Sequence, residues 1–160
     1  MALKVSSALF TDGGTLPNSA VFNGFGLTGG NISPDLTWSP GPAGTKSYVV
    51  TCYDPDAPTT VGFWHWLVMD IPGSVTTLPA GAGSPEKTAP GTILGHTDFG
   101  SIGYGGAAPP PGRTHHYHFN VYALDVDTLG LGSGTTGAML MFCMNGHILD
   151  QGRLTAVYAR

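Results

Sequence analysis

Three apolar segments rich in β-branched and aromatic residues constrain the fold of this chain more than any other feature: Ser47–Tyr53, Phe63–Ile71 and His116–Asp125. Segments of this length and composition, bounded by turn residues, are typical of strands. The chain also contains 25 glycines and 13 prolines, which divide it into short segments and disfavour a helical bundle. We therefore predict a mainly β fold: a β-sandwich-like domain built on a large sheet in which antiparallel pairing dominates.

Shorter elements complete this prediction. Leu3–Phe10, Leu36–Trp38 and Leu154–Tyr158 have the pattern of short strands. Gly137–Leu149 is the one convincing helix, because its apolar residues recur at helical spacing, and it is expected near the C-terminus. Other helices are expected to be short, and residues 73–100 are predicted to form a long polar loop.

The composition limits the class of function. Charged residues make up 10% of the chain and the net charge is −4, with six Lys and Arg that form no basic cluster. Nucleic acids and anionic membrane surfaces are therefore poor candidate partners. A length of 160 residues without an internal repeat or linker fits a single domain over residues 1–160.

The location of the protein is predicted from its N-terminus and its cysteines. The N-terminus lacks the apolar core of a signal peptide, and no run reaches the length of a transmembrane helix. Cys52 and Cys143 each lie in an apolar run, as buried reduced thiols do, and cannot complete a four-ligand zinc site. We expect a cytoplasmic protein with no membrane span.

A rigid acidic loop precedes a strand that carries a histidine. The run Asp54-Pro55-Asp56-Ala57-Pro58 places two carboxylates one residue apart, and its two prolines hold it extended. His65 follows seven residues after this run, between two tryptophans, in a strand that is otherwise apolar. This combination predicts a preformed polar pocket.

Strand alternation brings further polar groups to the same pocket. On the third long strand, His115 and Tyr117 share one face. By the same alternation, the residues that share a face with His65 are Phe63, Leu67 and Met69. If both strands belong to one sheet, His65, His115 and Tyr117 face one cavity, with the Asp54–Asp56 loop as its rim. The glycine- and proline-rich loop 103–112 is predicted to form a lip.

Two imidazoles, a phenol and backbone N–H groups suit a phosphate or carboxylate ligand, with the aspartates orienting the histidines. A hydrolase is an open alternative, in which Asp54 or Asp56 acts as general base and His65 or His115 as acid.

Two other motifs have weaker interpretations. His116 and His118, on the opposite strand face, could contribute to a zinc or copper site, although the sequence shows no obvious third ligand. A GxGxxG match at residues 24–29 follows no clear strand and opens no helix, so it does not indicate a dinucleotide site.

These motifs together resemble the phosphatidylethanolamine-binding protein family, specifically its bacterial Raf-kinase-inhibitor-like branch. The resemblance rests on the Asp54–Pro58 run, the Gly62–Val68 strand, the Gly103–Gly106 loop and the His115–Phe119 strand. Further matches extend over nearly the whole chain.

The resemblance implies a β-sandwich-like fold with a small anion pocket for phosphoryl or carboxylate groups, such as those of phosphorylethanolamine-like ligands. It also implies the residues of this pocket: Asp54, Asp56, Pro58, His65, His115 and Tyr117, with backbone groups of Ala107 and Ala108. Two positions depart from the usual family pattern. Ala107-Ala108 replace Pro-Cys, which could loosen the pocket lip, and His116 replaces an arginine on the opposite strand face.

The function implied is that of a binding protein rather than an enzyme, with no cofactor and no metal. Its implied partners are a small phosphorylated or carboxylated ligand and a kinase or protease that the protein inhibits or regulates. A homodimer is also implied, because bacterial relatives often form one.

Overall fold

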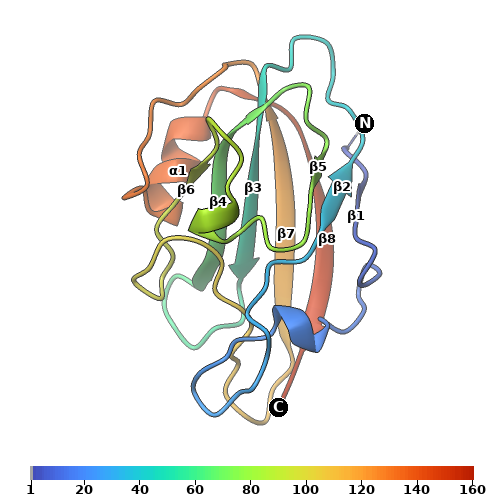
Figure 1. Cartoon of the computed structure of the whole chain (residues 1–160), viewed down its shortest axis with the longest axis vertical. Helices are drawn as coiled ribbons and strands as arrows, with labels where there is room; N and C mark the ends of the chain where they lie inside the picture. The colour runs from blue at the N-terminus through green and yellow to red at the C-terminus, as the bar shows by residue number, and fades with distance from the viewer. Residues whose placement is uncertain (1) are drawn as a thin grey trace.

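The computed structural model describes residues 2–160. Its larger sheet has five strands in the order β6-β4-β3-β7-β8, and every neighbouring pair is antiparallel. The bounds of these strands are β3 Ser47–Asp54, β4 Phe63–Pro72, β6 Ile93–Leu94, β7 His115–Leu124 and β8 Ile148–Tyr158. The three long apolar segments of the sequence thus form the adjacent strands β4, β3 and β7 (Figure 1).

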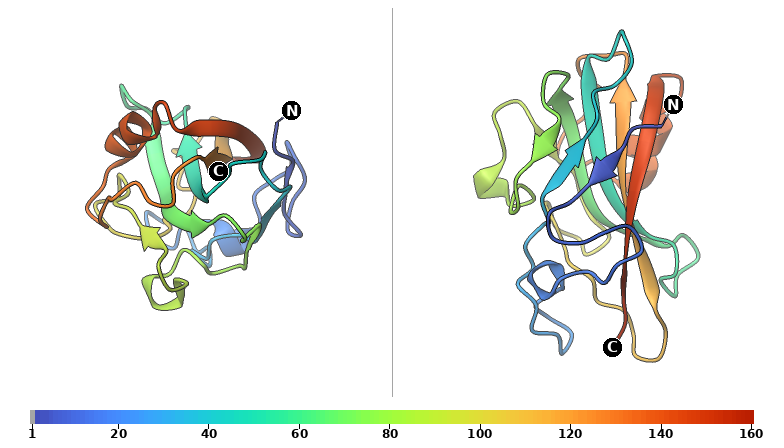
Figure 2. Two further views of the ribbon diagram at one scale, coloured as in Figure 1. Left: turned by 90° about the horizontal axis from the view of Figure 1, so that it is seen from above. Right: turned by 90° about the vertical axis from the view of Figure 1, so that its right-hand side faces the viewer.

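A smaller antiparallel sheet lies on one side of the larger sheet and a helix on the other (Figures 1 and 2). The strand order of the smaller sheet is β1-β2-β5, with bounds β1 Val5–Ser6, β2 Leu36–Trp38 and β5 Thr77–Leu78. The helix α1 spans Gly137–Met144, and two 3-10 helices, η1 and η2, span Asn18–Ala20 and Pro85–Lys87. The prediction of a mainly β, sandwich-like fold with a helix near the C-terminus is confirmed.

The centre of the larger sheet is buried on both faces, because almost every residue of β3 is buried and most residues of β4 are apolar. Val50 and Cys52 of β3 belong to the core between the two sheets. Val49, on the opposite face, packs in a second cluster with Leu140 and Met144 of α1. Each buried side chain of this size stabilises the fold by about 1.5–3 kcal/mol, so these two clusters hold the three layers together.

Strand β4 departs from regular alternation at His65. Cys52 of β3 pairs with Trp66, whereas the next residue, Tyr53, pairs with Trp64. His65 is therefore the extra residue of a β-bulge, with no partner in the ladder. A bulge re-aims the side chain of the residue it inserts.

Because of this bulge, one part of the predicted alternation is wrong. Leu67 and Met69, expected to share a face with His65, pack beneath α1. The His65 ring lies instead 5.2 Å from the ring of Tyr117, measured between centroids, and Tyr117 belongs to the core between the sheets. The predicted meeting of His65 with Tyr117 is observed, and the bulge is its physical cause.

The helix is shorter than the predicted segment Gly137–Leu149. It ends at Met144, because Gly146 adopts a left-handed φ of 88° that stops the helix. The last strand consequently begins at Ile148 rather than at Leu154.

Three further expectations need correction. The segment Leu3–Phe10 is a strand only at Val5–Ser6, and the predicted loop 73–100 contains β5, η2 and β6. Cys52 is buried as expected, but Cys143 is half-exposed, because it lies on the outer side of α1. Across residues 2–160, no helix has both the length and the apolar character needed to cross a bilayer.

Candidate functional site

A pocket of about 220 Å³ opens at the end of the larger sheet where β3 ends and β4 and β7 begin. Its floor consists of four buried polar side chains: Asp54, His65, His115 and Tyr117. Its mouth consists of one polar residue, Thr59, and eight apolar ones: Phe25, Ala57, Pro58, Phe63, Phe99, Ala108, Pro109 and Pro110. Three central strands therefore deliver the polar groups, and the loops between strands supply the apolar ones.

Asp54 and His115 form a buried pair in the floor. The Asp54 Oδ2 atom lies 2.7 Å from His115 Nδ1, and both side chains are almost completely buried. The other carboxylate oxygen accepts the backbone N–H of Asp56 at 2.8 Å. Because Nδ1 donates to the carboxylate, the free nitrogen of the His115 ring is Nε2.

His65 is held by the loop that precedes β7. Its Nδ1 donates to the carbonyl oxygen of Gly105 at 2.8 Å, and the Gly105 N–H donates to the His65 carbonyl at 2.9 Å. The free ring nitrogen is again Nε2, which accepts hydrogen bonds while the ring is neutral. Burial lowers the pKa of His65 below its ordinary value of 6.5 and outweighs the opposing effect of the Gly105 hydrogen bond.

Tyr117 has the clearest unmet requirement in the floor. Its buried hydroxyl lies near the Asp54 carboxylate but forms no hydrogen bond of good geometry within residues 2–160. Burial raises the pKa of this phenol, and the nearby Asp54 carboxylate raises it further, so the hydroxyl keeps its proton. A buried donor without a partner is costly, and a ligand oxygen in the pocket would satisfy it.

Two of the predicted site residues do not line this pocket. The Asp56 carboxylate bonds to the ring and backbone nitrogens of His116, each at 2.8 Å, and to Arg113 at 3.1 Å. Partial burial raises the pKa of Asp56, but the His116 hydrogen bonds outweigh it and lower the pKa. Ala107 is buried, and its carbonyl accepts the N–H of Phe22 at 3.0 Å, so it positions the lip without facing the pocket.

Phe63 was predicted on the strand face of His65, but the other aromatic residues of the mouth, Phe25 and Phe99, were not predicted from the sequence. Phe99 stacks on Phe22 at 4.5 Å between ring centroids and meets Phe63 edge-on at 4.8 Å. Phe25 lies beside this group and 69% of it is exposed. A phenylalanine between two glycines, at residues 24–26, was the available signal.

His116 and His118 lie outside the pocket. Their rings are 6.4 Å apart between centroids, and their Nδ1 atoms are engaged by Asp56 and by the hydroxyl of Thr155. No group of three or more His, Cys, Asp or Glu within residues 2–160 is arranged to hold a metal ion.

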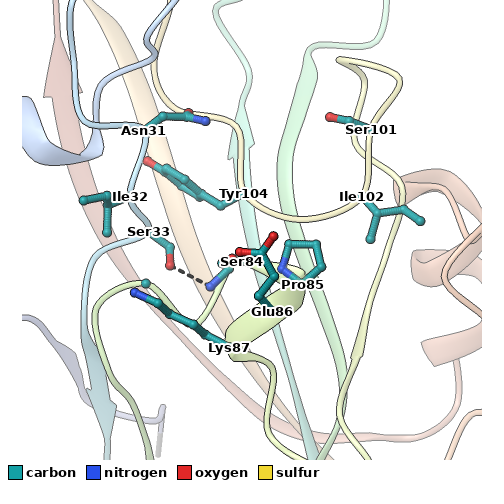
Figure 3. Close-up of a pocket in the computed structure, with 12 residues that line it drawn as sticks. Asn31, Ile32, Ser33, Ser84, Pro85, Glu86, Lys87, Ser101, Ile102 and Tyr104 are labelled. Carbon is teal, nitrogen blue, oxygen red and sulfur yellow. Dashed lines mark hydrogen bonds between the residues drawn. The ribbon is translucent and has the colours of Figure 1, made fainter.

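A larger hollow, of about 460 Å³, lies elsewhere, between the loops around Ser33, Ser84 and Tyr104 (Figure 3). Its buried Ser33 and its Tyr104 already bond to the protein: Ser33 Oγ accepts the N–H of Gly83 at 2.8 Å, and the Tyr104 hydroxyl donates to Ala20. Its other polar side chains include Glu86, Lys87 and Ser101, which are exposed to solvent. The bonds of Ser33 and Tyr104 hold loops together, so the smaller pocket is the better candidate despite its size.

The buried imidazole predicts a pH dependence of stability. Because the pKa of His65 is lowered in the folded state, the unfolded chain takes up its proton first as the pH falls below 6.5. The free energy of unfolding should therefore decrease between pH 7 and pH 5, with the stabilisation fully present above this window. Urea unfolding at several pH values checks this, and His65→Gln should flatten the slope.

His118 is the internal control for this measurement. Its pKa is also lowered, first by burial and then by Arg153, but it is less buried than His65. His118→Gln should therefore flatten the slope less than His65→Gln. An unchanged slope in His65→Gln would contradict the prediction. Asp56 does not affect the measurement between pH 7 and pH 5. Its pKa is lowered from the ordinary value of 3.8, so its contribution to stability changes only at lower pH.

The fold and the site together define a class of protein: a two-sheet β-sandwich with a pocket at one end of its larger sheet. The family model described as phosphatidylethanolamine-binding protein matches residues 6–159. UPF0098 protein YbhB of Escherichia coli (strain K12) is 49% identical over 158 residues, which cover 98% of this chain and 100% of YbhB. The chain therefore belongs to the phosphatidylethanolamine-binding protein family and is a binding protein of that family.

Two solved structures agree with this assignment. The crystal structure of Escherichia coli YbcL, described as a new member of the mammalian family, has a TM-score of 0.96 at 45% identity, covering 100% of this chain and 99% of YbcL. The homologue CT736 of Chlamydia trachomatis has a TM-score of 0.84 at 32% identity, covering 99% and 98%. The bacterial branch inferred from the motifs is thereby confirmed.

Proposed function

We propose that this chain binds a small ligand through a phosphoryl or carboxylate group seated on the pocket floor. The residues proposed to contact the ligand are Asp54, Pro58, His65, Ala108, His115 and Tyr117. The observation that carries the proposal is the buried Tyr117 hydroxyl without a partner. A phosphorylethanolamine-like ligand fits the same scheme, with an oxygen accepting from the Tyr117 hydroxyl.

Binding is supported better than hydrolysis. The Asp54 carboxylate is already engaged by His115 and by the Asp56 backbone, so it is not free to activate a water. Thr59 is the one Ser, Thr or Cys among the described residues that line the pocket, and its hydroxyl donates to the Gly62 carbonyl. Regulation of a kinase or protease extends the same proposal to a protein partner, because a phosphorylated side chain of that partner would present a phosphoryl group to the floor.

The test is an NMR titration of wild type and Tyr117→Phe with phosphate, acetate and phosphorylethanolamine. Removing one hydroxyl that bonds the ligand should weaken binding about tenfold, while the ring keeps its packing. The readout is saturable shifts of backbone signals at residues 54–58, 65 and 115–117.

Tyr48→Phe is a matched control, because the Tyr48 hydroxyl bonds to the Gly41 N–H at the opposite end of β3. It should leave affinity unchanged. Absence of saturable shifts at the pocket with all three probes would overturn the proposal, as would equal affinity in Tyr117→Phe and wild type.

A further inference from the structure

The mouth of the pocket is built for an aromatic group. Phe63 and Phe99 meet edge-on above the floor, and Phe99 also lies edge-on to His65 at 5.4 Å between centroids. Phe25 completes this wall, with its ring 6.3 Å from that of Phe99. Rings at these separations attract a further ring more strongly than burial alone would, and an aliphatic chain gains no such interaction.

Phe25 carries two costs that the fold alone does not explain. Its large side chain is 69% exposed, and its φ of 55° lies in the left-handed region that residues other than glycine rarely adopt. Unfavourable backbone geometry of this kind persists only where surrounding contacts impose it, and it clusters at ligand sites.

Arg160 imposes this geometry. Its guanidinium donates to the carbonyl of Phe25 at 2.6 Å and to the carbonyl of Pro109 at 2.8 Å. Phe25 and Pro109 belong to two loops on opposite parts of the chain, and both line the mouth. One side chain thus fixes the two lips of the pocket at a set separation.

The floor restricts the charge of the ligand. None of the described residues that line the pocket is Lys or Arg, and the floor already contains the Asp54 carboxylate. His65 presents Nε2 as an acceptor, since its Nδ1 is committed to Gly105. The polar groups of this floor can compensate at most one negative charge on a ligand. The Nε2 atom of His65 can also accept a hydrogen bond from a proton that the ligand retains.

From the mouth and the floor together, we infer that the ligand is a small aromatic oxyacid bound with no more than one negative charge, its acid group on the floor and its ring against Phe25 and Phe99. This inference rests on the proposed function, whose site it shares. Among the phosphoryl ligands of the proposed function, it favours phosphodiesters and phosphomonoesters that retain a proton over doubly charged phosphoryl groups.

The experiment compares affinities, by NMR titration, in wild type, Phe25→Ala and Phe142→Ala. Phe142 is the matched control, because it is an exposed phenylalanine on α1, outside the pocket. Benzoate, cyclohexanecarboxylate and acetate test whether the site prefers an aromatic ring. Methyl phenylphosphonate, compared with phenyl phosphate, tests whether the site limits the charge of the ligand. Phenyl phosphate carries close to two charges above neutral pH.

Benzoate should bind wild type about tenfold more tightly than acetate and several-fold more tightly than cyclohexanecarboxylate. Phe25→Ala should remove most of the affinity advantage of benzoate over acetate, and Phe142→Ala should change neither affinity. Methyl phenylphosphonate should bind at least as tightly as phenyl phosphate.

Other outcomes separate this inference from the proposed function. Equal affinities for benzoate and acetate, with shifts at the floor, would overturn the aromatic ligand and leave the proposed function standing. Tighter binding of phenyl phosphate would overturn the charge limit. No shift at the floor with any probe would overturn the proposed function and the inference together.

Discussion

Replacing Asp54 by alanine should destabilise the protein by about 3–5 kcal/mol, the cost of leaving one partner of a buried pair unsatisfied. The His115 ring, 98% buried, would lose the carboxylate that its Nδ1 contacts at 2.7 Å. The Asp56 N–H would lose its acceptor at the same time, which would loosen the loop that carries Pro58. Urea unfolding of the variant measures the loss, and binding to the pocket should disappear with it.

Asp56→Ala is the matched control for this prediction. The Asp56 carboxylate also pairs with a histidine at 2.8 Å, but its partner His116 is 51% exposed at the side chain. Exposed pairs of this kind contribute about 0–1 kcal/mol, and a second partner, Arg113, is more exposed still. Equal losses of stability in the two variants would show that the Asp54–His115 pair is not the source of the effect.

Replacing Gly105 by alanine should abolish binding to the pocket while the rest of the sheet stays folded. A Cβ atom at this position would overlap the ring of Phe99. That ring is stacked on Phe22 and contacts Phe63, so it cannot shift without disrupting the aromatic mouth. The same backbone holds His65 through two hydrogen bonds, and overpacking of this kind costs about 1–3 kcal/mol.

The measurement is a titration of Gly105→Ala with acetate and benzoate, alongside its unfolding curve. Gly132→Ala is the control, because a Cβ atom there meets nothing within 4 Å and the backbone is not left-handed. Wild-type affinity in Gly105→Ala would mean that Phe99 has room to move, and that the mouth is less rigid than its contacts suggest.

The long strands were predictable because their pattern is local. Ser47–Tyr53 and Phe63–Ile71 are rich in β-branched and aromatic residues, and each differs by one residue from the observed strand. The direction of the His65 side chain was harder to predict, because strict alternation of side chains assumes regular pairing between the strands. The bulge depends on pairing with Cys52 and Tyr53, which the sequence of β4 alone does not contain.

The polar half of the candidate site was predictable, whereas most of its aromatic half was not. Asp54, His65, His115 and Tyr117 stand out as polar or titratable groups in or beside apolar strands. Phe25 and Phe99 lie in loops, where a phenylalanine has no periodic pattern to mark it. They reach the pocket only through long-range contacts such as the bond from Arg160 to the Phe25 carbonyl.

The floor of the pocket also has a consequence for the order of folding. Its bonds join distant parts of the chain: Asp54 and His115 are 61 positions apart, and His65 and Gly105 are 40 apart. Closing loops of this size is slow compared with forming a hairpin, so we expect β3 and β4 to pair before β7 docks beside β3. The pair of β3 and β4 alone contains Asp54 and His65 but lacks His115 and Tyr117 of the floor. Ligand binding becomes possible only at the late step in which β7 docks, and a bound ligand would stabilise only the completed sheet.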